Sequence, residues 1–147
     1  MPDFIARMLR LAIALLVPLV CVTANALDKP TGDVVLTISG KVTTPNAGQR
    51  AVFDMAMLQK MPQHSFTTRT PWHASPARFT GPLLRDVLAA AGASGSKIVA
   101  TALNDYRTEI PFSDATRHEV IVAHLLDDKP MAVRDKGPLF IIPLRQQ

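Results

Sequence analysis

The sequence predicts an α+β domain with a mixed β-sheet, two short helices and several hairpins. Segments rich in β-branched residues recur along the chain, and only two segments have clear helical periodicity. Asn, Asp, Gly and Pro separate the later segments at the short spacing that is typical of hairpins. Hydrophobic residues make up 48% of the chain and charged residues 19%, a composition that favours a folded core over intrinsic disorder.

Residues 1–26 are predicted to be a secretory signal peptide. Arg7 and Arg10 precede an apolar run over residues 11–23, which is shorter than the roughly 20 residues that a membrane-spanning helix needs. An Ala-Asn-Ala tripeptide follows, with the small residues that suit a signal peptidase. The two arginines are not adjacent, so a Sec-type signal is expected and a twin-arginine signal is not. We therefore expect a periplasmic protein with one mature domain over residues 27–147, and an uncleaved membrane anchor is the alternative.

Composition excludes several function classes for the mature domain. The single cysteine, Cys21, lies within the predicted signal. The mature domain therefore has no disulfide framework, no cysteine-based zinc site and no thiolate nucleophile. Its basic residues are scattered singly along the chain, so we expect no nucleic-acid partner, and membrane contact only transiently through the signal peptide.

The first half of the mature domain is predicted to run strand, helix, strand. Residues 34–42 are rich in β-branched side chains and predict a strand. Asp54 can cap a short helix that Pro62 ends. Residues 64–70 predict a second strand, and residues 71–80, with their prolines, predict an irregular loop.

The second half is predicted to be one helix followed by short strands. Gly81-Pro82 opens the helix, where a proline near the first helical position costs nothing, and Gly92 ends it. Ser113 is predicted to cap a single helical turn. The remaining expected strands and turns are strands at 97–103, 107–111, 119–126, 131–134 and 139–144, and turns at 104–105, 127–128 and 136–138.

No arrangement of histidine, serine or acidic residues forms a catalytic or metal-binding motif. The histidines have no i, i+4 spacing, so neither a metal ligand nor a catalytic residue is predicted. A Ser-His-Asp triad could be drawn from Ser113, His118 and any of the aspartates, but no nucleophile-elbow pattern supports it.

Two segments remain as candidate binding residues, each with a structural alternative. Trp72 and His73 lie in a proline-rich loop between Arg69 and Arg78. They either line a ligand pocket, or Trp72 covers the core beneath the loop. The segment from Asp105 to Arg107 is likewise either part of a hairpin turn or the rim of the same pocket.

Four segments, taken in order, resemble the molybdopterin-binding domain of sulfite-oxidase-type oxidoreductases. Residues 79–88 resemble its aromatic-x-Gly-x-Pro-Leu stretch, and residues 104–111 resemble its Asp-Gly-Tyr loop leading to Ile-Pro. Residues 122–131 resemble its Ala-x-x-x-Asn-Gly-x-Pro strand and turn, and residues 136–143 resemble the Gly-x-Pro strand that closes the domain. The resemblance implies the sulfite-oxidase-type molybdopterin-binding fold. It is strongest to the small, exported, single-domain members of the family.

The sequence departs from the family pattern at the metal-binding position and at two other positions. In catalytic relatives a cysteine a few residues before a tryptophan binds molybdenum, and counting back from Trp72 places that position near Thr68. A neutral hydroxyl does not replace a soft thiolate. The segment 104–106 also lacks the family's glycine, and Phe140 stands where an arginine often follows Gly-x-Pro-x. The predicted Sec-type signal points the same way as the missing cysteine. The family's cofactor is inserted before the folded protein is exported by the twin-arginine route, whereas a Sec-type signal implies export of the unfolded chain.

These observations leave three hypotheses of function. The first is an exported, non-catalytic binding or sensory module without cofactor, which holds a small anionic ligand or a periplasmic protein partner. The second is a genuine molybdopterin-dependent oxidoreductase, and the third is an accessory subunit of a periplasmic complex. Arginines present a planar fork to phosphate or carboxylate, so they are the expected anion contacts. The residues expected to bind the cofactor or ligand, by resemblance and loop position, are Arg69, Trp72, His73, Arg78, Asp105, Tyr106 and Arg107.

Overall fold

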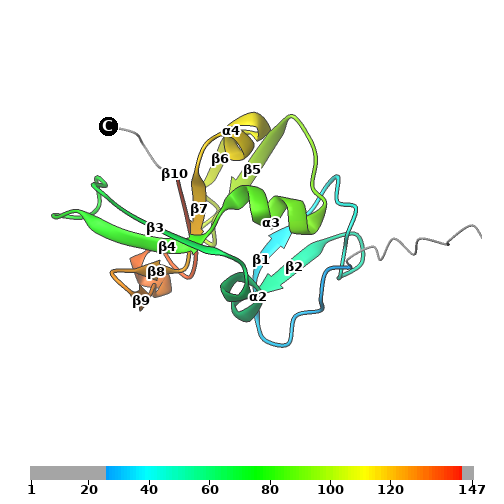
Figure 1. The fold of residues 1–147 in the computed structure, drawn as a ribbon, viewed down its shortest axis with the longest axis horizontal. Coiled ribbons are helices and arrows are strands. Elements are labelled where there is room, and N and C mark those ends of the chain that lie inside the picture. Colours follow the sequence, from blue (N-terminus) through cyan, green and yellow to red (C-terminus); the bar gives the residue numbers. More distant parts are fainter. Residues whose placement is uncertain (1–25, 144–147) are drawn as a thin grey trace, which may run out of the picture.

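The computed structural model describes residues 26–143. The predicted signal up to residue 25 and the last four residues, 144–147, lie outside the described residues. Within the described range the chain folds into several small sheets with three α-helices, which confirms the α+β class (Figure 1). None of the helices in this range has the length and hydropathy that crossing a bilayer requires.

One carboxylate ties the start of the described chain to the first hairpin and helix. Strand β1 (Val34–Ile38) pairs antiparallel with β2 (Ala51–Asp54), and helix α2 (Met55–Lys60) follows at once. Asp54 caps α2 as predicted, because its side chain accepts the Met57 N–H at 2.8 Å. Its second oxygen accepts the N–H of Gly32 at 2.9 Å. These backbone donors, that of Gly32 foremost, hold the pKa of the Asp54 carboxyl below its ordinary value.

A long hairpin reaches out from the body of the molecule (Figure 1). It consists of β3 (Gln63–Thr68) and β4 (Ala77–Pro82), which pair antiparallel over their whole length. The short strands β8 (Leu125–Leu126) and β9 (Lys129–Pro130) extend this sheet in the order β3-β4-β8-β9. β3 is therefore an edge strand of the sheet.

Two predictions around β4 are wrong. Residues 77–80, predicted as loop, belong to the strand. Pro82 ends β4 and does not open the helix, which begins at Leu84. The reason is a long-range interaction, because Phe79 pairs with Phe66 across the hairpin and is buried. The composition of residues 77–80 alone does not predict that pairing.

Helix α3 (Leu84–Ala91) buries one face against the sheets. Its buried side chains follow helical spacing, and Gly92 forms the predicted C-cap in the left-handed region with a φ of 60°. The buried residues on this face are Leu84, Val87, Leu88 and Ala91.

A second hairpin and a short helix follow α3. Strands β5 (Lys97–Thr101) and β6 (Arg107–Pro111) pair as predicted, with the turn between them. Helix α4 (Phe112–Arg117) starts directly after β6, so Pro111 is its N-cap where Ser113 was expected. Phe112 packs against the core, which favours the earlier start.

The predicted strand at 119–126 is divided at His124. β7 (Val120–Ala123) pairs antiparallel with β10 (Phe140–Pro143), while the His124 N–H turns aside and donates to the Thr80 carbonyl at 2.9 Å. The chain then enters β8.

The Asp127-Asp128 turn between β8 and β9 has the predicted conformation. Both residues have positive φ, 49° and 64°, as this kind of tight hairpin turn requires. The return strand predicted at 131–134 is wrong. A 3₁₀ turn, η1 (Val133–Asp135), stands there, and the N–H groups of Asp135 and Gly137 both bond to the Ala132 carbonyl.

Every pairing between the described strands is antiparallel, where a mixed sheet was expected. Hairpin connections join β3 to β4, β5 to β6, and β8 to β9, and parallel pairing would need a longer crossover connection. The strands form four small sheets, and side-chain packing in the two hydrophobic cores holds these sheets together.

Strand β7 lies between two hydrophobic cores and contributes side chains to both. Successive side chains of a strand point to opposite faces. Val120 and Val122 pack in a core with α2, α3 and β2, whereas Ile121 and Ala123 pack in a second core with β4 and β10. All four side chains are buried, which explains why this segment reads as a continuous apolar run.

β4 crosses β7 at backbone contact. A Cβ on Gly81 would lie 2.0 Å from the Val122 carbonyl oxygen, closer than any real Cβ contact. Immediately beyond this point, Leu83 and Ile121 form an isolated β-bridge. Only glycine therefore permits the crossing that sets the two cores side by side.

We expect Gly81→Ala to destabilise the fold by about 2–3 kcal/mol or to prevent folding, since backbone must move to relieve the clash. Gly32→Ala is the matched control, because a Cβ there meets only Asp54 atoms at 3.8 and 3.9 Å. Urea unfolding followed by circular dichroism measures both variants. Equal stability of the two variants would contradict the crossing.

Candidate functional site

The loop at the end of the β3–β4 hairpin places an exposed aromatic side chain over the second core. Trp72 lies in this loop with 59% of its surface exposed. Its ring meets the Phe140 ring edge-on, with 5.8 Å between the centroids and 89° between the planes. The Lys136 ammonium lies over the indole, 4.9 Å from the ring centroid. Such a contact is worth about 0.5–1 kcal/mol at an exposed site.

Phe79 forms the base of this arrangement. Its buried ring stands 5.8 Å from that of Phe140 and 5.9 Å from that of His73. His73 also forms a hydrogen bond with the Thr70 hydroxyl, which shapes the loop. We call the group of Trp72, His73, Lys136 and Phe140 the Trp72 surface.

Lys136 reaches the Trp72 surface through a tightly fixed turn. It follows η1 with a φ of 71°, and its N–H bonds to the Val133 carbonyl. A Cβ on the next residue, Gly137, would lie 2.2 Å from the Met131 carbonyl oxygen. The Gly-Pro pair after Lys136 is thus a second close backbone approach, and it sets where the ammonium stands.

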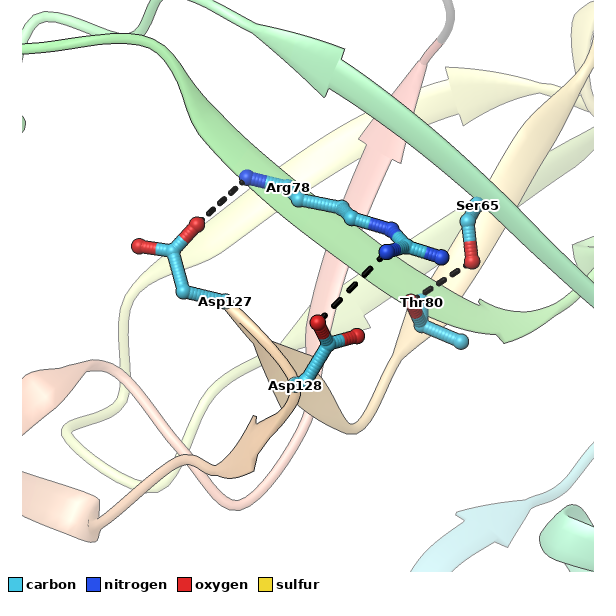
Figure 2. A network of polar contacts seen from close by, with 5 residues as sticks. All are labelled: Ser65, Arg78, Thr80, Asp127 and Asp128. Carbon is cyan, nitrogen blue, oxygen red and sulfur yellow. Dashed lines mark hydrogen bonds and ion pairs between the residues drawn. The ribbon is translucent and has the colours of Figure 1, made fainter.

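Arg78 contacts the two aspartates of the β8–β9 turn (Figure 2). Its backbone N–H donates to the Asp127 carboxylate at 2.9 Å, and its guanidinium forms an ion pair of 3.5 Å with Asp128. Figure 2 shows the side chain lying beside the hydrogen-bonded hydroxyls of Ser65 and Thr80, which are 2.7 Å apart. Arg78 therefore holds the β8–β9 turn against β4.

Strand alternation separates Arg78 from the Trp72 surface. Phe79 points into the second core, so its neighbour Arg78 points to the opposite face of β4. Both members of the Arg78–Asp128 pair are more than half exposed, and such a pair contributes little to stability.

The structure brings together only part of the predicted site. Trp72 and His73 belong to one surface, and Arg69 lies exposed in the same loop. Asp105, Tyr106 and Arg107 belong to the β5–β6 hairpin, where Tyr106 is exposed and its N–H bonds to the Asn104 side chain. Within residues 26–143, no hydrogen bond, ion pair or ring contact joins this turn to the Trp72 surface.

Lys136 is not among the predicted binding residues, and Phe140 is notable in the sequence only as a departure from the family pattern. Both reach Trp72 through the folding of β10 onto β7 and β4, a long-range event. The local signal was the Gly-Pro pair at 137–138, whose steric role fixes the position of both residues.

Thr68 does not supply the chemistry of a metal ligand. It ends β3 opposite Ala77, and its hydroxyl makes only a long contact of 3.5 Å with the Arg69 carbonyl. Its uncharged oxygen lacks the soft, negative donor atom of a thiolate. Among the residues that the structure describes, no three His, Cys, Asp or Glu side chains are grouped closely enough to hold a metal ion. A threonine at the position near which the resemblance places the metal-binding cysteine does not fit that attachment, because its hydroxyl is not a thiolate.

A small hollow of about 180 Å³ lies elsewhere, between the start of the described chain and α2. Its lining includes Leu27, Met57 and Met61 together with the two lysines Lys29 and Lys60. It contains none of the predicted site residues, and it is below the usual size of a small-molecule site.

His124 is buried beside the hairpin that carries the Trp72 surface. Its Nε2 lies 2.6 Å from Oε1 of Gln63, whose amide nitrogen donates to the carbonyls of Leu58 and Met61. Gln63 can therefore only accept at Oε1, which assigns the proton to Nε2 of His124. Burial lowers the pKa of His124 from its ordinary 6.5.

Comparison with known proteins agrees with the architecture. A family model described as the oxidoreductase molybdopterin binding domain matches residues 25–144. No curated protein matches the chain.

His124 predicts acid sensitivity of the fold. In the unfolded chain His124 takes up a proton near pH 6.5, whereas burial opposes protonation of His124 in the folded protein. The contribution of neutral His124 to stability is therefore fully present above about pH 6.5 and is lost as the pH falls below that value. His124→Gln should reduce the drop in urea midpoint between about pH 7.5 and about pH 5.5. His118→Gln, at an exposed histidine, is the control and should leave the drop unchanged. An unchanged drop in His124→Gln would refute this origin.

Proposed function

The chain belongs to the oxidoreductase molybdopterin binding domain family, and from that membership we propose that it is a non-catalytic binding module of the family. The observation that carries the proposal is Thr68, a hydroxyl residue at the position where the resemblance places the metal-binding cysteine. Such a module keeps the domain's scaffold and binds through the Trp72 surface.

The retained scaffold supports a role that depends on shape. Gly81 and Gly137 each allow a backbone approach that a side chain would block. Both belong to the segments that resemble the family, and both fix residues of the Trp72 surface or its base. A chain that has both close backbone approaches but carries threonine at position 68 is better suited to binding a ligand or partner than to metal chemistry.

The composition of the exposed loop supports the same role. Trp72 is exposed although its ring is large and apolar, and Lys136 adds a positive charge directly beside it. Tryptophan is enriched among the residues that dominate binding energy at interfaces. An anionic ligand or partner suits this pair.

The direct test is the cofactor content of the purified protein. We expect neither molybdenum nor pterin in the wild-type chain from a molybdenum-replete host, whether it is expressed with or without residues 1–26, because Thr68 offers no thiolate. Elemental analysis and pterin fluorescence after acid oxidation measure both. Near-stoichiometric molybdenum with pterin would overturn the proposal and make the protein an oxidoreductase.

A cysteine variant adds a second readout to this test. Thr68→Cys supplies a thiol at the proposed former ligand position, whereas Thr67→Cys places it on the opposite face of β3. Molybdenum gained by Thr68→Cys alone would support the assignment of position 68. Gain by both variants would show unspecific thiol binding.

We further propose that the protein is exported by a Sec-type signal and acts in the periplasm. Cleavage after Ala26 would leave Leu27 as the first residue, and Leu27 packs against the core. N-terminal sequencing of the protein from a periplasmic fraction of a Gram-negative host should begin at Leu27. An intact Met1 in the membrane fraction would point to an anchor instead.

A further inference from the structure

We propose that the Trp72 surface docks an acidic segment of a partner protein that carries an aromatic or large aliphatic side chain. This inference rests on the proposed function, because it names the occupant of the same surface.

Exposed apolar side chains stand in both segments that meet at the indole. Trp72 is 59% exposed, and Val133, in the 3₁₀ turn that Lys136 follows, is 65% exposed. Burying this apolar area against a partner is favourable at roughly 25 cal/mol per Å² before the costs of association. The partner segment therefore needs an apolar side chain to cover the indole.

The surface is fixed before a partner arrives. Phe140 meets the indole edge-on, Phe79 supports Phe140, and the Lys136 ammonium lies over the ring. Side chains already held in place lose less conformational entropy on binding than free ones. A rigid, exposed tryptophan is thus a suitable anchor for docking.

The charges around the indole select an acidic occupant. Lys136 touches the ring, and Arg134 extends from the same turn with 88% of its side chain exposed. Asp135 lies 3.7 Å from Arg134, and among residues 26–143 no carboxylate forms an ion pair with the Lys136 ammonium. A carboxylate on the incoming segment would pair with Lys136.

The openness of the surface favours a protein segment over a small molecule. Small-molecule sites bury most of their ligand in a cavity. Trp72 lies in the loop between β3 and β4, whose hairpin stands away from the body (Figure 1), and the hollow described above lies at α2 instead. An extended segment can gain contacts along such a surface where a small molecule cannot.

The experiment is a selection of random dodecapeptides displayed against the immobilised mature chain. We expect enriched peptides with Asp or Glu beside an aromatic or Leu residue. Trp72→Ala should weaken their binding at least about tenfold and Lys136→Gln about threefold or more, measured by calorimetry. Raising the salt concentration should weaken wild-type binding more than that of Lys136→Gln.

Matched controls separate this surface from others. Leu103→Ala removes an exposed apolar side chain from another hairpin, and Lys41→Gln removes an exposed lysine. Both should bind the selected peptides within about twofold of wild type. Trp72→Phe, which keeps an aromatic ring against Phe140, should show intermediate affinity, and melting curves check that each variant is folded.

Trp72 is the only tryptophan of the chain, so its fluorescence reports binding directly in the wild-type protein. Selected peptides should shift or quench it. The proposal is overturned if no peptides are enriched, if enriched peptides are basic, or if Trp72→Ala binds them unchanged. It is also overturned if phenylacetate binds as tightly as the peptides, because the surface would then serve small anions. None of these results bears on cofactor content, which tests the proposed function separately.

Discussion

The crossing of β4 over β7 is the contact on which the rest of the molecule depends. At this point the backbones touch, and only the absence of a side chain at Gly81 allows it. The crossing puts a core on each face of β7, with Val122 directed to one and Ile121 to the other. The first core contains side chains of the three helices, whereas the second core contains side chains of β4, β7 and β10 together with Leu83 and Met131. The crossing thereby determines where the hairpin leaves the body.

The Trp72 surface is a consequence of that geometry. Phe79 is anchored in the second core one strand position from Arg78, and the two side chains point to opposite faces of β4. One face therefore packs against Phe140 and supports Trp72, while the other carries the Arg78–Asp128 pair and its neighbouring hydroxyls (Figure 2). The second close approach, at Gly137, fixes Lys136 above the indole. Two glycines thus position a surface to which they contribute no atom.

Local signals predicted the elements that local interactions determine. The Asp54 cap, the Gly92 cap and the Asp127-Asp128 turn all depend on backbone geometry within a few residues, and the structure confirms them. The strand at 77–82 and the contact of Trp72 with Lys136 depend on partners far along the chain, so composition could not predict them. For the same reason the predicted site residues divide between two hairpins. The resemblance of motifs supplied what periodicity could not, because its glycines mark the two close approaches.

Rotation of the Trp72 side chain tests most directly whether this surface is built in advance. Time-resolved fluorescence anisotropy can measure it without a probe, because the chain has one tryptophan. If Phe140 and Lys136 hold the indole, its emission should depolarise only with the tumbling of the whole protein, while iodide still quenches it. A large subnanosecond component in the free protein would contradict the account, since Trp72 would then be an unrestrained loop side chain without a fixed recognition surface.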